Sequence, residues 1–233
     1  MITIYTLTYN EQLLIQFTIN HYRERFGNCH IVVYDNMSTD ETVKIARANN
    51  CEVILFDTDN QYSEGRQIQI RNSCWKKAKT DWVLVCDIDE LLDINESELK
   101  AENVVGTTIV KTEVYDMINM KDNKDISGMK YGVKSDLPGK FCLFNRKYIR
   151  EMNYGPGSHS CKPIGTVIYS NKTYKLYHFN SINENLTIEK FKLRAARMSE
   201  ENKKNGWGFH YYMTPKQIRE EYAAERSKAI KVR

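Results

Sequence analysis

The alternation of short β-rich runs with helix-period segments over the first ninety residues constrains the fold of this chain more than any other feature. The pattern predicts strands at 2–8, 30–34, 51–56 and 82–86, and helices between them at 11–26, 38–48 and 64–78. Strands that alternate with helices build a parallel sheet with crossover helices. The sequence therefore predicts an α/β protein whose mixed, mainly parallel central sheet is flanked by helices.

The second part of the chain follows a less regular pattern. Strands are predicted at 107–114, 140–145 and 173–178, and helices at 187–204 and 214–230 close the chain. A length of 233 residues suffices for one substantial core and is short for two independent domains. We therefore expect a single domain over 1–233 with C-terminal helices. Within it, Ser38 and Glu41 form a capping-box pattern that predicts the start of the second helix.

An acidic motif, Asp87-Ile88-Asp89-Glu90, follows the apolar strand at 82–86, which we expect to be central and buried on both faces. In open α/β sheets, ligands bind outside the carboxyl ends of the strands. Because side chains alternate along an extended chain, Asp87 and Asp89 can face one divalent cation, Mn²⁺ or Mg²⁺, while Ile88 points inward. On its own, the motif also fits a solvated turn.

Two more strand ends point to the same crevice, Thr8-Tyr9-Asn10-Glu11 and Asp35-Asn36-Met37-Ser38-Thr39-Asp40. Together with the acidic motif, they resemble glycosyltransferase family 2 and its relatives in order, spacing and secondary-structure context. The resemblance implies a GT-A (Rossmann-like) fold. In it, residues 1–95 form the nucleotide-binding half, and residues 96–233 form the acceptor-binding half with the C-terminal helices.

The resemblance also implies an activity, the metal-dependent transfer of a sugar from a nucleotide-diphosphate sugar, with UDP-sugar as the default donor. The acceptor would be a glycan, a protein (giving a glycoprotein) or a lipid-linked sugar (a glycolipid), and transfer would invert the anomeric centre. An aromatic ring suits a planar base, and a guanidinium suits a phosphate. The donor residues implied are Thr8, Tyr9, Glu11, Asp35, Asn36, Arg66, Arg71, Asp87 and Ile88.

The metal site and the general base are less fully specified. Asp87 and Asp89 are the predicted metal ligands, with His178 as a third ligand or, alternatively, a core histidine. An inverting transfer needs a base to take the proton of the acceptor hydroxyl. The Glu-Asp pair of family 2 is missing from the expected region, so His159, Asp136 and Asp116 all stay open, with His159 preferred.

Other functions fit the sequence less well. A nucleotidylyltransferase would need a Gly-rich basic loop after the first strand, and a dinucleotide dehydrogenase would need GxGxxG there. The chain carries a net charge of only +4 and no nucleic-acid recognition motif, so we expect no nucleic-acid partner. A non-catalytic module of GT-A fold that binds a nucleotide sugar or glycan stays open as the alternative.

Cysteines and apolar runs bear on location. The six cysteines are scattered without a CxxC pair, and no apolar run approaches the roughly 20 residues that span a bilayer. We therefore expect a cytoplasmic protein without a transmembrane segment. The basic stretch 190–204 leaves contact with phosphates or with an anionic membrane surface open, although its simplest interpretation is a solvated helix face.

Overall fold

The computed structural model describes residues 1–121 and 123–233. Its first half alternates strands and helices as the sequence predicts. The elements are β1 (Ile2–Thr8), α1 (Ile15–Phe26), β2 (His30–Asp35), α2 (Thr42–Ala48), β3 (Glu52–Leu55), α3 (Glu64–Ser73), the 3-10 turn η1 (Cys74–Lys77) and β4 (Trp82–Asp87).

The second half is richer in strands than the sequence pattern predicts. Its elements are β5 (Glu90–Leu92), α4 (Glu96–Val104), β6 (Ile109–Ile118), β7 (Tyr131–Lys134), β8 (Leu143–Asn145), β9 (Ile149–Glu151), η2 (Pro156–Ser158), β10 (Ile164–Gly165), β11 (Tyr169–Ser181), α5 (Glu184–Ala196), α6 (Glu200–Asn205), η3 (Phe209–Tyr212), α7 (Pro215–Lys228) and β12 (Ile230–Lys231).

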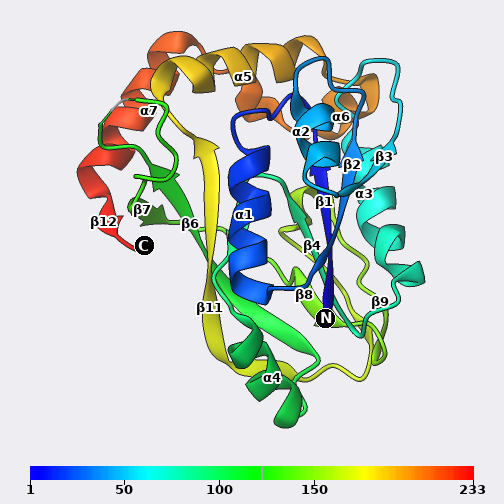
Figure 1. Cartoon of the computed structure of the whole chain (residues 1–233). Helices are drawn as coiled ribbons and strands as arrows, with labels where there is room; N and C mark the ends of the chain where they lie inside the picture. Colours follow the sequence, from blue (N-terminus) through cyan, green and yellow to red (C-terminus); the bar gives the residue numbers. More distant parts are fainter. Residues whose placement is uncertain (122) are drawn as a thin grey trace.

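One large sheet joins the two halves in the order β12-β7-β6-β8-β4-β1-β2-β3, and β11 pairs with both β5 and β6. The longest strand pairings, β1 with β2, β1 with β4 and β11 with β6, are parallel, whereas β8 runs antiparallel to β4. The predicted mixed, mainly parallel α/β fold is therefore confirmed. Figure 1 shows α1 against one face of the sheet and α5, α6 and α7 along the end toward which β1 points.

The central position predicted for the apolar strand is confirmed. β4 lies between β1 and β8, and Val83 and Leu84 are completely buried. A strand covered on both faces needs an almost unbroken apolar sequence, which is what this segment has. The polar motif that follows β4 is therefore held on a rigid support.

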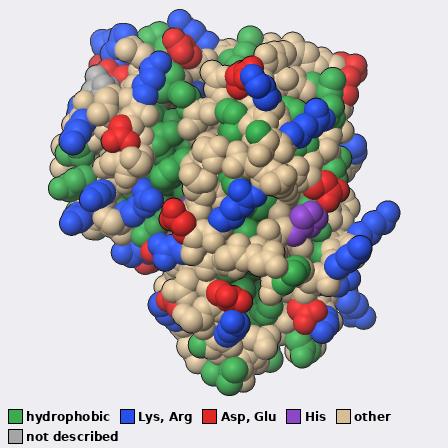
Figure 2. Space-filling view, in the orientation of Figure 1, with side chains coloured by type: hydrophobic (Ala, Val, Ile, Leu, Met, Phe, Trp, Pro, Cys, Tyr) green, Lys and Arg blue, Asp and Glu red, His purple; other side chains and the backbone are tan. Residues whose placement is uncertain are grey.

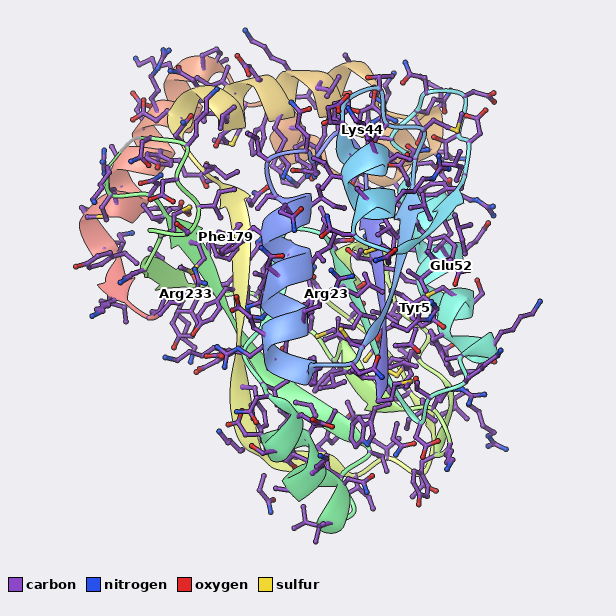
Figure 3. All side chains as sticks on the ribbon, in the orientation of Figure 1. Tyr5, Arg23, Lys44, Glu52, Phe179 and Arg233 are labelled. Atoms are coloured by element: carbon purple, nitrogen blue, oxygen red, sulfur yellow. The ribbon has the colours of Figure 1, made fainter. Side chains whose placement is uncertain are left out.

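Helix α1 buries the apolar stripe that its sequence predicts, with Ile15, Ile19, Tyr22 and Phe26 all in the core. It begins four residues later than predicted, because residues 12–14 form a turn. Phe17 packs edge to face on Phe179 of β11 with ring centroids 5.4 Å apart, and Figure 3 shows Phe179 beside this helix. The helix thus packs β11 against the first half of the chain.

The predicted capping box at Ser38 is wrong. Helix α2 begins at Thr42, and its N-cap residue makes no side-chain capping bond. The Ser38 hydroxyl donates to Asp35 and accepts from the backbone N–H of Asn10, at 2.8 Å. The serine therefore joins the ends of β1 and β2 and is not available to start a helix.

The predicted helix at 187–204 is two helices. Helix α5 ends at Ala196 and α6 begins at Glu200, because Ser199 caps α6 by accepting from the N–H of Asn202. Between them, the backbone pairs with Tyr62: the Tyr62 N–H donates to the Arg197 carbonyl at 2.6 Å, and the Ser199 N–H donates to the Tyr62 carbonyl at 3.2 Å. The chain before α3 is thereby joined to the C-terminal helices.

Two surface features complete the description. Lysine and arginine side chains are interspersed with acidic ones on the face drawn in Figure 2. Within 1–121 and 123–233, the helices are all too short or too polar to span a membrane.

Candidate active site

A cavity of about 780 Å³ lies at the carboxyl ends of β1, β2 and β4, covered by α5, η3 and α7. Its wall combines the three strand ends singled out in the sequence with residues of the second half. Of the predicted site residues, it includes Thr8, Tyr9, Glu11, Asn36, Arg71, Asp87, Ile88, Asp89, His159 and His178. The parallel register of β1, β2 and β4 brings these ends to one edge of the sheet.

The acidic motif turns its carboxylates in different directions. Asp87 accepts from Arg71 at 2.8 Å, and its other oxygen lies 3.8 Å from the Lys140 ammonium. Asp89 accepts from Lys190 at 2.9 Å. Glu90 forms a buried ion pair with Lys140. All three carboxylates line the cavity, each beside a different cation.

Both aspartates of the acidic motif have lowered pKa values. Burial alone would raise the pKa of Asp89, but Lys190, His178 and Arg194 lower it well below its ordinary value. Burial likewise opposes the charge on Asp87, whose pKa is lowered by Arg71 and Lys140. The two carboxylates are therefore anions at neutral pH, the form that ligates a cation.

The two arginines predicted beside the pyrophosphate face opposite ways. Arg71 is buried between Asp87 and Glu64, which lie 2.8 and 2.9 Å away. Arg66 is exposed, bonds Gln69 at 3.1 Å and does not line the cavity. Residues five apart on a helix lie on different faces. The structure thus retains Arg71 as a candidate phosphate contact and places Arg66 outside.

The loop after β1 is built against the loop after β2. The Glu11 N–H donates to the Thr42 hydroxyl at 2.8 Å, and Thr8 is buried with its hydroxyl unbonded in the described part of the chain. Asp35, predicted at the base edge, is fully buried, accepts both the N–H and the hydroxyl of Ser38, and does not line the cavity. Asn36 does line it.

Tyr9, the residue predicted to stack on the nucleobase, already contacts Arg197. The Arg197 guanidinium lies 3.2 Å from the centre of the Tyr9 ring. It also donates to the Asn36 side chain at 2.8 Å. One face of Tyr9 is therefore covered by Arg197, and a base that stacks here must use the remaining face or displace the guanidinium.

His178 lines the cavity. Its Nδ1 is 2.8 Å from Asp116, and its Nε2 is 3.9 Å from Asp89. Burial lowers its affinity for a proton, but the hydrogen bond to Asp116 and the charges of Asp89 and Glu90 raise its pKa above the ordinary value. The His178 ring is therefore held beside Asp89 by Asp116, in surroundings that favour its protonated form.

The base candidates occupy different positions. His159 lines the cavity after the η2 turn, and its Nδ1 is buried and has no hydrogen-bond partner among the residues described. Burial, followed by the charges of Lys140 and His178, lowers the pKa of His159 to about 4. Asp116 also lines the cavity, whereas Asp136 is exposed and lies outside it.

Three cations of the basic stretch 190–204 belong to the site, although the preferred interpretation of that stretch was a solvated helix face. Lys190, Arg194 and Arg197 line the cavity, so the interpretation of this stretch as a wholly solvated face is wrong for them. Their spacing of four and three residues places them on one helix face, and that periodicity was visible in the sequence. By contrast, Lys192 of the same helix is exposed.

The predicted metal ligands do not form a closed site. Across 1–121 and 123–233, no three histidine, cysteine, aspartate or glutamate side chains gather as a metal-binding group. Mg²⁺ and similar cations are, however, commonly held by one or two carboxylates together with substrate phosphates. Asp87 and Asp89, ionised on the wall of one cavity, fit such a shared site.

The first part of the chain matches a known family. The family model described as Glycosyl transferase family 2 matches residues 3–152, which contain all three strand-end motifs. No curated protein matches the chain at a significant level.

Similar solved structures include S. aureus TarS 1–349, at 18% identity over 84% of this chain and 64% of that chain, with a TM-score of 0.46. TarS 1–349 in complex with UDP-GlcNAc matches at 17% identity, over 84% and 66% of the two chains, with a TM-score of 0.44. The mannosyltransferase PcManGT from Pyrobaculum calidifontis, in complex with GDP-Man and Mn²⁺, matches at 20% identity, over 48% and 34%, with a TM-score of 0.37. The chain spans less than two thirds of each of them.

Proposed function

The chain belongs to glycosyl transferase family 2, and from this premise we propose that it transfers a sugar from a nucleotide-diphosphate sugar to a glycan, protein or lipid-linked acceptor. The donor proposed in the first instance is a UDP-sugar. One observation carries the proposal: the three strand-end motifs meet in a single cavity that Asp87 and Asp89 face as paired anions. Six free thiols support a cytoplasmic location as part of the proposal.

The donor would lie across the strand ends. Thr8 offers to the base and ribose a hydroxyl that has no partner among the described residues, and Tyr9 offers an aromatic ring. Asn36 also lines the cavity, with its side-chain oxygen bonded to Arg197. Arg71 and Lys140 lie next to Asp87, where the diphosphate would come. Asp87 and Asp89 would hold Mn²⁺ or Mg²⁺, which supplies neutralisation of the charge that develops on the leaving diphosphate.

The transfer itself needs a base on the acceptor side. The acceptor oxygen bonds to the anomeric carbon as the bond from that carbon to the diphosphate breaks, and the hydroxyl proton passes to the base. We assign this role to His159, because its ring is neutral at pH 7 and its Nδ1 lies unbonded at the cavity. Attack from the side opposite the leaving group inverts the anomeric centre.

The proposal is tested by thermal stabilisation with UDP, GDP, ADP and CDP, each with and without Mn²⁺. We expect one nucleotide to raise the melting temperature only when Mn²⁺ is present, because ligand binding to the native state stabilises it by about 2.7 kcal/mol at a hundred times its Kd. The responding nucleotide identifies the donor base. If folded protein responds to none of them, the nucleotide-sugar proposal falls and a glycan-binding module takes its place.

His159→Gln is expected to lower sugar transfer by about 10²- to 10⁴-fold, the usual contribution of a positioned base. Stabilisation by nucleotide and Mn²⁺ should not change, because His159 is assigned to the acceptor side. Initial rates of nucleotide release measure the effect, with Asp136→Asn as the control outside the cavity. A large loss in Asp116→Asn together with near-normal rates in His159→Gln would move the role to Asp116.

A further inference from the structure

The cationic face of α5 offers a function that the strand-end motifs do not cover. Lys190 is 17% exposed at its side chain, and its ammonium lies 2.9 Å from Glu11 and 2.9 Å from Asp89. Those carboxylates are 11% and 6% exposed. The Lys190 ammonium of α5 therefore lies between the loop after β1 and the loop after β4.

Arg194, one helical turn further on, completes this group. Its guanidinium lies 3.9 Å from Glu11, bonds the Tyr211 hydroxyl and lies 5.0 Å from the centre of the Tyr211 ring. Lys190 and His178 both face the Oδ2 oxygen of Asp89, at 2.9 and 3.9 Å. A divalent cation that approaches Asp89 without a bound anion thus meets the positive charge of Lys190 at this carboxylate.

A nucleoside diphosphate changes this balance, because it brings negative charge to the same wall. Lysine has a compact charge on a flexible four-carbon stem, so it can exchange one oxygen partner for another without backbone movement. Arginine presents a fixed fork of donors that suits phosphate oxygens. Lys190 and Arg194 are therefore placed to contact a diphosphate from α5, beside Asp89, whereas Arg71 of α3 lies beside Asp87.

We propose that Lys190 and Arg194 form a diphosphate-binding site on α5, and that Lys190 occupies Asp89 until the diphosphate draws it away. Metal binding at Asp89 then depends on prior or joint binding of the nucleotide. The proposal rests on the proposed function, since it concerns the same donor site, and it adds the order in which the ligands bind.

The test measures binding by calorimetry on the full chain, with Mn²⁺ alone, with UDP or GDP alone, and with both. Lys190→Met is expected to bind Mn²⁺ alone about tenfold more tightly than the wild type, and to bind the nucleotide about tenfold more weakly. Lys190→Arg should keep nucleotide binding near the wild-type value, because it keeps the charge. Lys192→Met, an exposed change on the same helix, is the matched control and should leave both affinities unchanged.

The outcomes separate the two proposals. If the wild type binds nucleotide with Mn²⁺ and Lys190→Met shows the same affinities, the role of Lys190 is wrong and the donor site stands. Weaker Mn²⁺ binding in Lys190→Met would also overturn it. If no nucleoside diphosphate binds the wild type with Mn²⁺, the proposed function itself fails. Should Lys190→Met not fold, as judged by circular dichroism, Lys190→Gln provides the same comparison with a polar side chain.

Discussion

Asp89→Ala is expected to abolish the joint stabilisation by nucleoside diphosphate and Mn²⁺ and to lower turnover by about 10²- to 10³-fold, the loss that follows removal of one group that stabilises charge in a transition state. Asp89 is more buried than Asp87, the other aspartate of the acidic motif. The fold should persist, because Lys190 keeps Glu11 as its partner at 2.9 Å.

The measurement combines the melting temperature, with and without ligands, and the rate of nucleotide release. Asp136→Ala is a suitable control, since it removes an exposed carboxylate outside the cavity. Unchanged turnover in folded Asp89→Ala would make the acidic motif a structural turn. It would also remove the main reason for placing the metal here.

Lys140→Met is expected to have the largest effect on stability. It should lower the free energy of unfolding by about 3–5 kcal/mol, because it leaves the buried Glu90 carboxylate without its cationic partner. Lys140, in the loop before β8, and Glu90, at the start of β5, are 5% and 1% exposed at their side chains and form an ion pair. Burial opposes the charge on Lys140, but Glu90 and Asp87 raise its pKa, so the ammonium stays charged.

Urea unfolding measures this loss, and the double variant Glu90→Gln with Lys140→Met should recover most of it. A matched control is Lys147→Met, which breaks the pair with Asp81 at 2.7 Å, where the side chains are 60% and 49% exposed. That change should cost less than about 1 kcal/mol. If Lys140→Met were as stable as the Lys147 control, the buried pair would contribute little to the fold.

Local sequence patterns predicted the elements of the first half well. The burial of β4 and the apolar stripe of α1 follow from patterns within each segment, and the acidic motif follows from its place after β4. A local signal was also overlooked: Asn95 and Glu98 form the capping box that begins α4. Such features depend on neighbours in sequence, so one segment is enough to predict them.

The contacts that complete the site could not be predicted in this way. Lys140 meets Glu90 because the second half of the chain folds back beside β4, and Arg197 reaches Asn36 from a helix far along the chain. Asp35 shows the opposite case, a carboxylate at a strand end that a neighbouring serine holds inside the protein. Residue type alone does not distinguish these outcomes, because each depends on which distant segment is near.

The backbone pairing of Tyr62 with residues 197 and 199 has a consequence for motion. The Asn202 side chain adds to it, since it donates to the Tyr62 carbonyl at 2.9 Å and accepts from the Glu64 N–H at 2.9 Å. Release of a bulky product commonly requires the cover of an enzyme cavity to move. While these hydrogen bonds last, α6 cannot move away from the segment before α3. Either that segment moves together with α6, or the hydrogen bonds at Tyr62 break.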